Sequence, residues 1–139
     1  MMKRKIVNKK IQELDKYLKQ LRKYEGICTD ELKNDLDKMW IVERGLQLSI
    51  QLILDIGNHI LADKGISVDK YADIFIKLGE NNIIPKKFAE NIKGMAGFRN
   101  ILVHEYAEID VEIIANVLNN SLDDFKKFAE HINNYLENK

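Results

Sequence analysis

The spacing of apolar residues constrains the fold of this chain more than any other feature of its sequence. Near the start, Val7, Ile11, Leu14, Leu18 and Leu21 recur every three or four positions. This spacing places the five side chains on one side of an α-helix. Similar spacing continues along most of the chain, and no run of convincing length alternates polar and apolar residues as a β-strand does. The sequence therefore predicts an all-α fold.

Turn-forming residues divide this helical pattern into five segments. Gly26, Gly65 and Pro85 mark three of the breaks, and the fourth lies at residues 105–108. Glycine and proline end helices, and proline also suits the first turn of the next helix. We predict four long helices, with one short helix at 67–78 between the second and third of them. Short polar breaks favour an antiparallel helical bundle, formed by a single domain over residues 1–139.

The predicted second helix is apolar on more than one side. It carries one stripe that includes Leu46 and Ile53, and a second stripe that includes Trp40, Leu52 and Ile56. A helix with two apolar stripes is too hydrophobic to pack on one neighbour only. We expect this helix to be central in the bundle or shared with a second subunit, and Trp40 to lie in the core or in a dimer contact.

Charge is balanced overall but unevenly distributed. The 22 basic and 22 acidic side chains cancel, which gives no sign of a general nucleic-acid or membrane binder. Residues 1–24 nevertheless hold nine Lys or Arg against two acids, and residues 105–139 hold eight acids against three lysines. Two interpretations stay open: the two ends form solvated or mutually attracting helix faces, or the first helix is a basic arm for phosphates.

Several classes of protein and of site are not favoured. Cys28 is the single cysteine, so neither an internal disulfide nor a cysteine-based zinc site is available. The basic start is not followed by the apolar stretch of a signal peptide, and no segment is apolar enough to span a membrane. No histidine or carboxylate cluster has convincing metal-ligand spacing, and no glycine-rich loop follows a strand. We expect a cytoplasmic protein without a metal or cofactor.

Four polar residues interrupt an apolar run: Arg99, Asn100, His104 and Tyr106. On an ideal helix Asn100 and His104 share one face, whereas Arg99 and Tyr106 share another. Arg99 and His104 differ by about 140° around the axis, so one copy of the helix does not simply clamp a small group between them. Either the long arginine side chain bends round the helix, or a second copy of the chain completes a site.

The chemistry of these side chains suits RNA cleavage without a metal. Histidine can transfer protons near neutral pH, and arginine binds phosphate through two hydrogen bonds. His104 would move protons at the attacking 2′-hydroxyl or the leaving 5′-oxygen, Arg99 would bind the scissile phosphate, and Asn100 would orient the histidine or the substrate. The simpler alternative is a charge pair at a helix end, with Glu105 or Glu108 as the partner.

Other residues receive smaller predictions. Gly94 and Gly97 lie one turn apart just before the polar cluster. We interpret them mainly as allowing close helix approach, with backbone access for RNA as the alternative. Asp55 and His59 are four residues apart on the second helix, which favours a local pair. Without other information, Tyr106 would be an aromatic residue at a helix end with its hydroxyl in water.

The segment "RNILVHEY" resembles the R-x4-H-x-Y signature of the HepT toxins, which belong to the larger HEPN group. The resemblance extends to "MWIVERGLQLSIQLILDIGNHI" (39–60) and to "KGMAGFRNILVHEYAEID" (93–110). Helix order, the short middle helix and the acidic entry into the last helix also agree. The bare R-N-x3-H pattern has low specificity, whereas the longer blocks in this order are strong.

The resemblance implies a HEPN-like bundle that forms a homodimer, with the motifs of two subunits meeting in a cleft at the interface. It implies the toxin of a type II toxin–antitoxin system and a metal-independent endoribonuclease. Arg99 and His104 would be its catalytic pair, supported by Asn100. A two-fold axis would then bring two sets of these residues to one RNA phosphate.

The resemblance also implies a switch. The antitoxin of such pairs, MNT, is a minimal nucleotidyltransferase that resembles enzymes transferring AMP from ATP, and the acceptor would be Tyr106. A bulky anion two residues from His104 would repel RNA and block the cleft. The alternatives are a non-catalytic HEPN module that docks a nucleotidyltransferase partner and, less favoured, a structural four-helix dimer.

Overall fold

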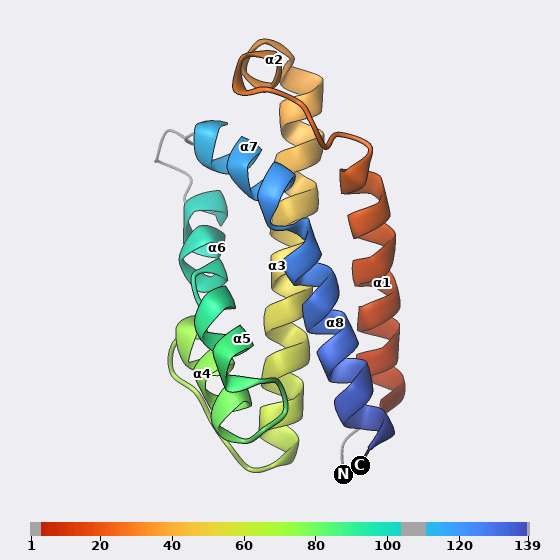
Figure 1. Cartoon of the computed structure of the whole chain (residues 1–139), viewed down its shortest axis with the longest axis vertical. Helices are drawn as coiled ribbons and strands as arrows, with labels where there is room; N and C mark the ends of the chain where they lie inside the picture. The colour runs from red at the N-terminus through yellow and green to blue at the C-terminus, as the bar shows by residue number, and fades with distance from the viewer. Residues whose placement is uncertain (1–3, 104–110, 139) are drawn as a thin grey trace.

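A computed structural model describes residues 4–103 and 111–138, except for the side chains of residues 101 and 103. Within these ranges the chain is entirely helical apart from turns, which confirms the predicted all-α fold (Figure 1). The helices are α1 (Arg4–Arg22), α2 (Thr29–Asn34), α3 (Leu36–Asp63), α4 (Tyr71–Glu80), α5 (Lys86–Ile92), α6 (Met95–Val103), α7 (Val111–Asn120) and α8 (Leu122–Glu137). None of them is long and apolar enough to cross a membrane.

Helix α3 is the centre of the bundle. It has 28 residues and packs against α1 and α8 on one side and against α4 and α6 on the other (Figure 1). The chain runs up α1, down α3, up through α5 and α6, and down α8 in the view of Figure 1, which gives the predicted antiparallel arrangement. The expectation of a central second helix is confirmed, because α3 contacts α1, α2, α4, α6, α7 and α8.

Three of the five predicted helices are each divided in two. The predicted second helix breaks at Asp35, whose backbone is extended (φ −122°, ψ 97°) and whose carboxylate accepts a hydrogen bond from the Lys38 amide at 3.1 Å. This N-cap starts α3. The fourth predicted helix breaks at Lys93 and Gly94, and the last breaks at Ser121. The described residues thus form eight helices and not the predicted five. Apolar spacing continues across a break of one or two residues, so the spacing does not reveal the break.

The apolar core joins all the layers. Phe75 on α4 and Phe128 on α8 are fully buried and meet edge to face with ring centroids 6.2 Å apart. From the second apolar stripe of α3, Leu52 and Ile56 are buried as expected. Trp40 is not part of the core, since 63% of it is exposed. The second apolar stripe is thus buried at Leu52 and Ile56 and exposed at Trp40, near the N-terminus of α3.

Close helix approach occurs at Gly57 and not at the glycines where it was predicted. A Cβ atom at Gly57 would lie 2.6 Å from Cγ2 of Ile74, so this glycine lets α4 pack directly on α3. At Gly94, in the break before α6, and at Gly97, a Cβ atom would meet no described atom within 4 Å apart from chain neighbours and, for Gly97, the backbone of α6. The prediction that these two glycines permit close packing was therefore wrong for contacts within the described chain.

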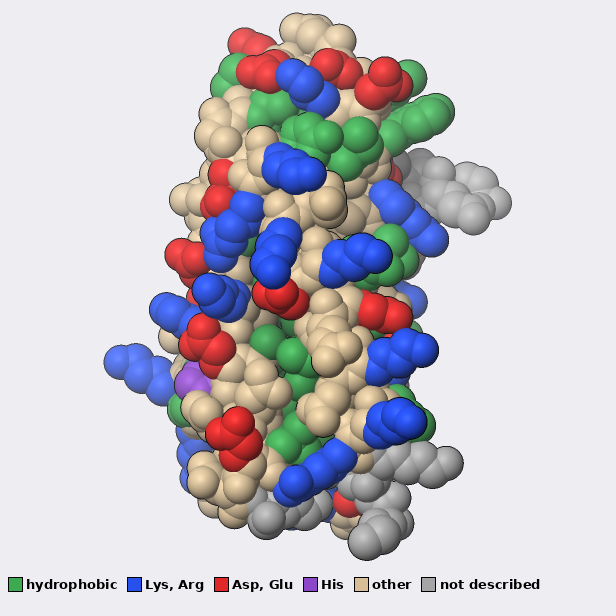
Figure 2. Space-filling model, turned by 90° about the vertical axis from the view of Figure 1, so that its right-hand side faces the viewer, with side chains coloured by type: hydrophobic (Ala, Val, Ile, Leu, Met, Phe, Trp, Pro, Cys, Tyr) green, Lys and Arg blue, Asp and Glu red, His purple; other side chains and the backbone are tan. Residues whose placement is uncertain are grey.

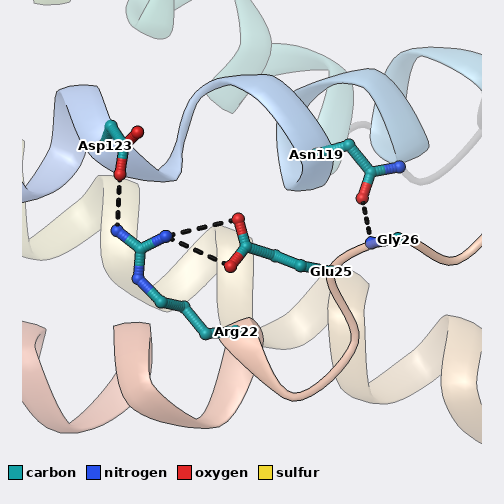
Figure 3. A network of polar contacts seen from close by, with 5 residues as sticks. All are labelled: Arg22, Glu25, Gly26, Asn119 and Asp123. Atoms are coloured by element: carbon teal, nitrogen blue, oxygen red, sulfur yellow. Dashed lines mark hydrogen bonds and ion pairs between the residues drawn. The ribbon is translucent and has the colours of Figure 1, made fainter.

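Opposite charges connect the two ends of the chain. Arg22 at the end of α1 donates to Asp123 on α8 at 2.8 Å and to Glu25 at 3.1 Å (Figure 3). Nearby, the Gly26 amide donates to the side-chain oxygen of Asn119 at 2.7 Å. These contacts fix the turn after α1 against the junction of α7 and α8. They support the interpretation that the basic and acidic ends attract each other.

Most lysines of α1 do not take part in that network. Figure 2 shows basic side chains spread over the face that α1 forms, with fewer acidic ones between them. The exposed lysines of this helix are Lys5, Lys9, Lys16 and Lys19. Arg22 and Arg4, which donates to the Leu136 carbonyl, bond to α8. The second interpretation, a basic surface for phosphates, stays a prediction.

Candidate functional site

The first half of the polar motif lies on α6. Arg99 and Asn100 belong to this helix, with Arg99 partly buried and Asn100 exposed. His104 and Tyr106 lie outside the described residues. The buried side chains of Phe98 and Leu102 fix the orientation of α6 in the bundle. The helix therefore presents Arg99 and Asn100 toward α3 and α4, and the placement of His104 relative to them stays a prediction.

Two side chains from other helices hold Arg99. Its Nε donates a hydrogen bond to Oε1 of Gln51 on α3 at 3.3 Å. Its guanidinium carbon lies 4.5 Å from the centre of the Tyr71 ring, at the start of α4. A guanidinium at this distance from an aromatic ring is attracted by the ring's negative face. Arg99 is thus fixed from two directions by residues far away in the sequence.

A chain of polar contacts orients Gln51 in turn. Its Nε2 donates to Oδ1 of Asp55, one turn further along α3, at 2.9 Å. The other carboxylate oxygen of Asp55 lies 3.9 Å from Nζ of Lys10 on α1. Because the amide nitrogen is engaged by Asp55, the amide oxygen must face Arg99. A neutral acceptor holds the guanidinium without cancelling its charge, which leaves that charge available for an anionic substrate.

Arg99 lies beside a cleft of about 660 Å³ formed by α3, α6, α4 and the turn before α4. Asn100, Tyr71 and Asp55 line this cleft together with apolar side chains beneath them. A volume of this size can hold a small molecule or a nucleoside. Among the described residues, no three of His, Cys, Asp and Glu lie close enough together to bind a metal ion.

The sequence did not identify Gln51 and Tyr71 as residues of the site. The Gln51 side chain was not singled out because a glutamine within a helix has no distinctive pattern, and Tyr71 resembles any aromatic residue near a helix start. The one available signal was the spacing of Gln51 and Asp55, which are four residues apart in a mostly apolar helix. Asp55 was instead expected to pair with His59, whereas its described contacts are with Gln51 and Lys10.

A second, smaller hollow lies further up α3, around the exposed Trp40, and Glu43, Arg44 and Gln47 complete its lining. Burial raises the pKa of the Glu43 carboxyl above its usual value. The ionised form of Glu43 is thus disfavoured in the folded chain. The stability that the protonated Glu43 carboxyl contributes is fully present below its pKa in the unfolded chain. This stability is lost as the pH rises through the raised pKa of the folded chain.

Replacing Glu43 by glutamine is therefore expected to change stability in a pH-dependent way. Glutamine removes the ionisable group, so the Glu43→Gln variant should gain stability over the wild type as the pH rises above about 4.5. At pH 3, where Glu43 is protonated in both states, this pH-dependent gain should be absent. Denaturant titrations from pH 3 to 8 would measure it, and a difference that is constant over that range would contradict the assignment.

Comparisons with known proteins identify the family of this chain. The model of the family described as "Ribonuclease HepT-like" matches residues 14–132. The "tRNA nuclease HepT" of Aphanizomenon flos-aquae is 33% identical, over 94% of this chain and 90% of that protein. The "mRNA nuclease HepT" of Shewanella oneidensis is 30% identical, over 91% of this chain and 96% of that protein.

Solved structures give the same result. A tri-AMPylated HEPN toxin of Shewanella oneidensis in complex with the MNT antitoxin superposes with a TM-score of 0.81 at 30% identity, over 93% of this chain and 97% of that one. The cytosolic protein YutE of Bacillus subtilis, at 20% identity and a TM-score of 0.84, shares the fold. The family match, the two relatives and the common bundle show that this chain belongs to the HepT-like ribonuclease family.

Proposed function

We propose that this chain is the toxin of a toxin–antitoxin pair and cleaves RNA without a metal ion, with Arg99, Asn100 and His104 at its active site. Membership in a ribonuclease family makes it an RNA-cleaving enzyme. The observation that carries the site assignment is the position of Arg99. The first residue of the R-x4-H motif is held by Gln51 and Tyr71 beside the cleft formed by α3, α4 and α6.

In the proposed reaction, each motif residue has a separate role. Arg99 binds the scissile phosphate and stabilises the charge that builds up on its oxygens. His104 takes the proton from the attacking 2′-hydroxyl or gives one to the leaving 5′-oxygen. Asn100, which is exposed in the cleft next to Arg99, orients the substrate or the histidine. No bound ion is needed, because these groups supply both the positive charge and the proton transfer.

A second copy of the chain completes the proposed site. Leu36, Trp40 and Ile41 are 61%, 63% and 48% exposed on the N-terminal part of α3. Trp40 lies on the same side of α3 as Gln51 and Asp55, since their spacings are close to whole turns. A subunit packed on the uncovered apolar residues would therefore adjoin the cleft beside Arg99. This supports a homodimer whose two motifs share one cleft.

The proposed partner is a nucleotidyltransferase of the MNT type, which switches the toxin off by adding AMP to Tyr106. The support is the related toxin of Shewanella oneidensis, which was solved in a tri-AMPylated form in complex with the MNT antitoxin. The added phosphates would carry negative charge close to His104 and repel RNA. In this proposed function, residues 1–139 form one domain that acts in the cytoplasm, where RNA and ATP are both available.

Cleavage of RNA in the presence of EDTA tests the central claim. We expect the purified protein to cut RNA at the same rate with and without the chelator. The alternative is a HEPN module that only docks a nucleotidyltransferase, and it predicts no cleavage in either condition. Growth assays separate the two further: a variant that lacks both Arg99 and His104 should be harmless if catalysis is the toxic act, and fully toxic if docking is.

Coexpression with a nucleotidyltransferase of the MNT type is expected to add AMP to the toxin. Each AMP unit adds about 329 Da, a mass that follows from the chemistry of the group. The Tyr106→Phe variant should gain no mass, because it lacks the hydroxyl that loses its proton and attacks the α-phosphate of ATP, which releases pyrophosphate. Intact-protein mass spectrometry measures this directly. Tyr135→Phe is the control and should be modified like the wild type; AMP on Tyr106→Phe would contradict the assignment.

A further inference from the structure

We infer that the cleft beside Arg99 is a nucleobase subsite, which takes the base of a nucleotide adjacent to the cleaved phosphate. This inference rests on the proposed RNA cleavage and adds to it where the substrate base lies. The cleft is defined by side chains of α3, α4 and α6 and by the turn before α4, and it contains Gly97 and Asn100 of the motif helix.

Gly97 gives the first argument. It is the third residue of α6, and glycine is a poorer helix former than alanine. Its φ is not positive, and a Cβ atom there would meet no described atom within 4 Å beyond its own helix. Neither the backbone nor packing within the described chain therefore requires glycine. Gly97 lines the cleft, so the space it leaves is available to a molecule that enters the cleft.

The lining of the cleft matches the surfaces of a nucleobase. Leu54, Ile74 and Ala96 are buried and give the cleft an apolar base. Asn58 on α3 and Asn100 on α6 add exposed side-chain amides. A planar base has apolar faces, and its edge carries hydrogen-bond donors and acceptors that amides can read. Single-stranded RNA bases are commonly recognised in this way.

The charges in the cleft favour a base over a phosphate. Asp55 and Asp69 line it together with one basic residue, Lys70. A phosphate inside the cleft would face two carboxylates, whereas the amino groups of a base can donate to them. Arg99 does not line the cleft itself, but its guanidinium lies against Tyr71, which does line the cleft. This places the phosphate-binding cation next to the cleft and the base within it.

Tyr71 links the two parts of the proposed site. It is 38% exposed, contacts the Arg99 guanidinium and lines the cleft. Stacking of a base on an aromatic side chain is worth roughly 1–3 kcal/mol, which corresponds to about a 5- to 150-fold change in binding. A base that contacts Tyr71 would therefore fix the neighbouring phosphate close to Arg99.

The test compares two leucine variants on matched RNA substrates. The cut is first mapped in a short RNA, and then abasic versions of that RNA are made that lack the base on either side of it. We expect the wild type to cleave one abasic RNA at least tenfold less efficiently than the intact RNA, measured as kcat/KM. Gly97→Leu fills the cleft and should cleave both about equally. Gly94→Leu, at a glycine equally free of neighbours but outside the cleft, should behave as the wild type does.

The results separate this inference from the proposed function. If the wild type cleaves no RNA, the proposed function fails. If it cleaves but treats intact and abasic RNA alike, or if Gly97→Leu keeps the discrimination, the nucleobase subsite is wrong. Light scattering measures the molar mass of each variant. A change in subunit number in Gly97→Leu alone would show that a second copy of the chain fills the cleft, and this result would also overturn the nucleobase subsite.

A second variant covers the case in which Gly97→Leu does not fold. Asn58 is exposed on α3, so Asn58→Ala should leave the thermal unfolding midpoint unchanged. It removes an amide from the edge of the cleft. If the subsite exists, this variant should lose several-fold of the preference among the four bases at the position identified with abasic RNA. An unchanged preference would count against the subsite.

Discussion

Replacing Arg99 by alanine is expected to lower kcat/KM for RNA cleavage by about 10²- to 10³-fold, the usual cost of removing a group that stabilises transition-state charge. The expected loss is large because Arg99 is held in position before the substrate binds, by Gln51 at 3.3 Å and by the Tyr71 ring at 4.5 Å. His104→Ala should cause a loss of similar size by removing proton transfer. Initial rates on a fluorescent RNA would measure both.

Two conservative variants give this prediction its controls. Arg99→Lys keeps the charge but loses the two-pronged contact with phosphate, so it should recover only part of the activity. Gln51→Glu keeps an acceptor for Arg99 but makes it anionic, which pairs with the guanidinium and places a second carboxylate beside Asp55. We expect an intermediate loss of kcat with the fold intact. Full activity of Arg99→Ala would remove Arg99 from the active site.

Replacing Phe128 by alanine is expected to lower the free energy of unfolding by about 3–5 kcal/mol, the range found for large core aromatics. Phe128 is fully buried on α8 and meets Phe75 of α4 edge to face at 6.2 Å. Its removal would leave a cavity between α4 and α8 and would also lose the ring–ring contact. Urea unfolding followed by circular dichroism would measure the change.

Phe88 is the matched control for Phe128. It lies on α5, is only partly buried, and packs against the ring of His131 at 4.7 Å. Phe88→Ala should cost clearly less, because less apolar surface is lost and water can fill the space. All samples need one protein concentration, since association adds to apparent stability. Equal losses for the two variants would contradict the described core.

Arg99 and Asn100 could be placed on one helix from the sequence, and both lie on α6. Both residues were singled out by their positions in a short motif, and in the structure Asn100 lines the cleft of about 660 Å³ while Arg99 lies beside it. Their partners could not be identified this way. Gln51 is 48 residues from Arg99, and nothing in the local pattern of either residue indicates the contact. Which side chains meet across helices depends on how those helices pack.

The same distinction applies to the glycines and to Trp40. Gly57 and Gly97 both occur in helical segments, and only the neighbouring helix shows that Gly57 is in close contact with Ile74 while Gly97 faces open space. Trp40 continues an apolar stripe of α3 in sequence, but no other described element covers it. A hydrophobic residue in an apolar stripe indicates a surface that favours burial. The stripe does not show whether another helix of the same chain or a second molecule buries that surface.

The sequence by itself determined the helical fold and the antiparallel order of the long helices, because these follow from apolar spacing and short breaks, and the resemblance of its motif blocks indicated the family. It did not determine the breaks at Asp35 and Ser121, since apolar periodicity is the same on both sides of a break. The tertiary structure alone decided the support of Arg99 by Gln51 and Tyr71 and the shape of the cleft. The physical reason is that periodicity is local, whereas a site depends on packing between helices.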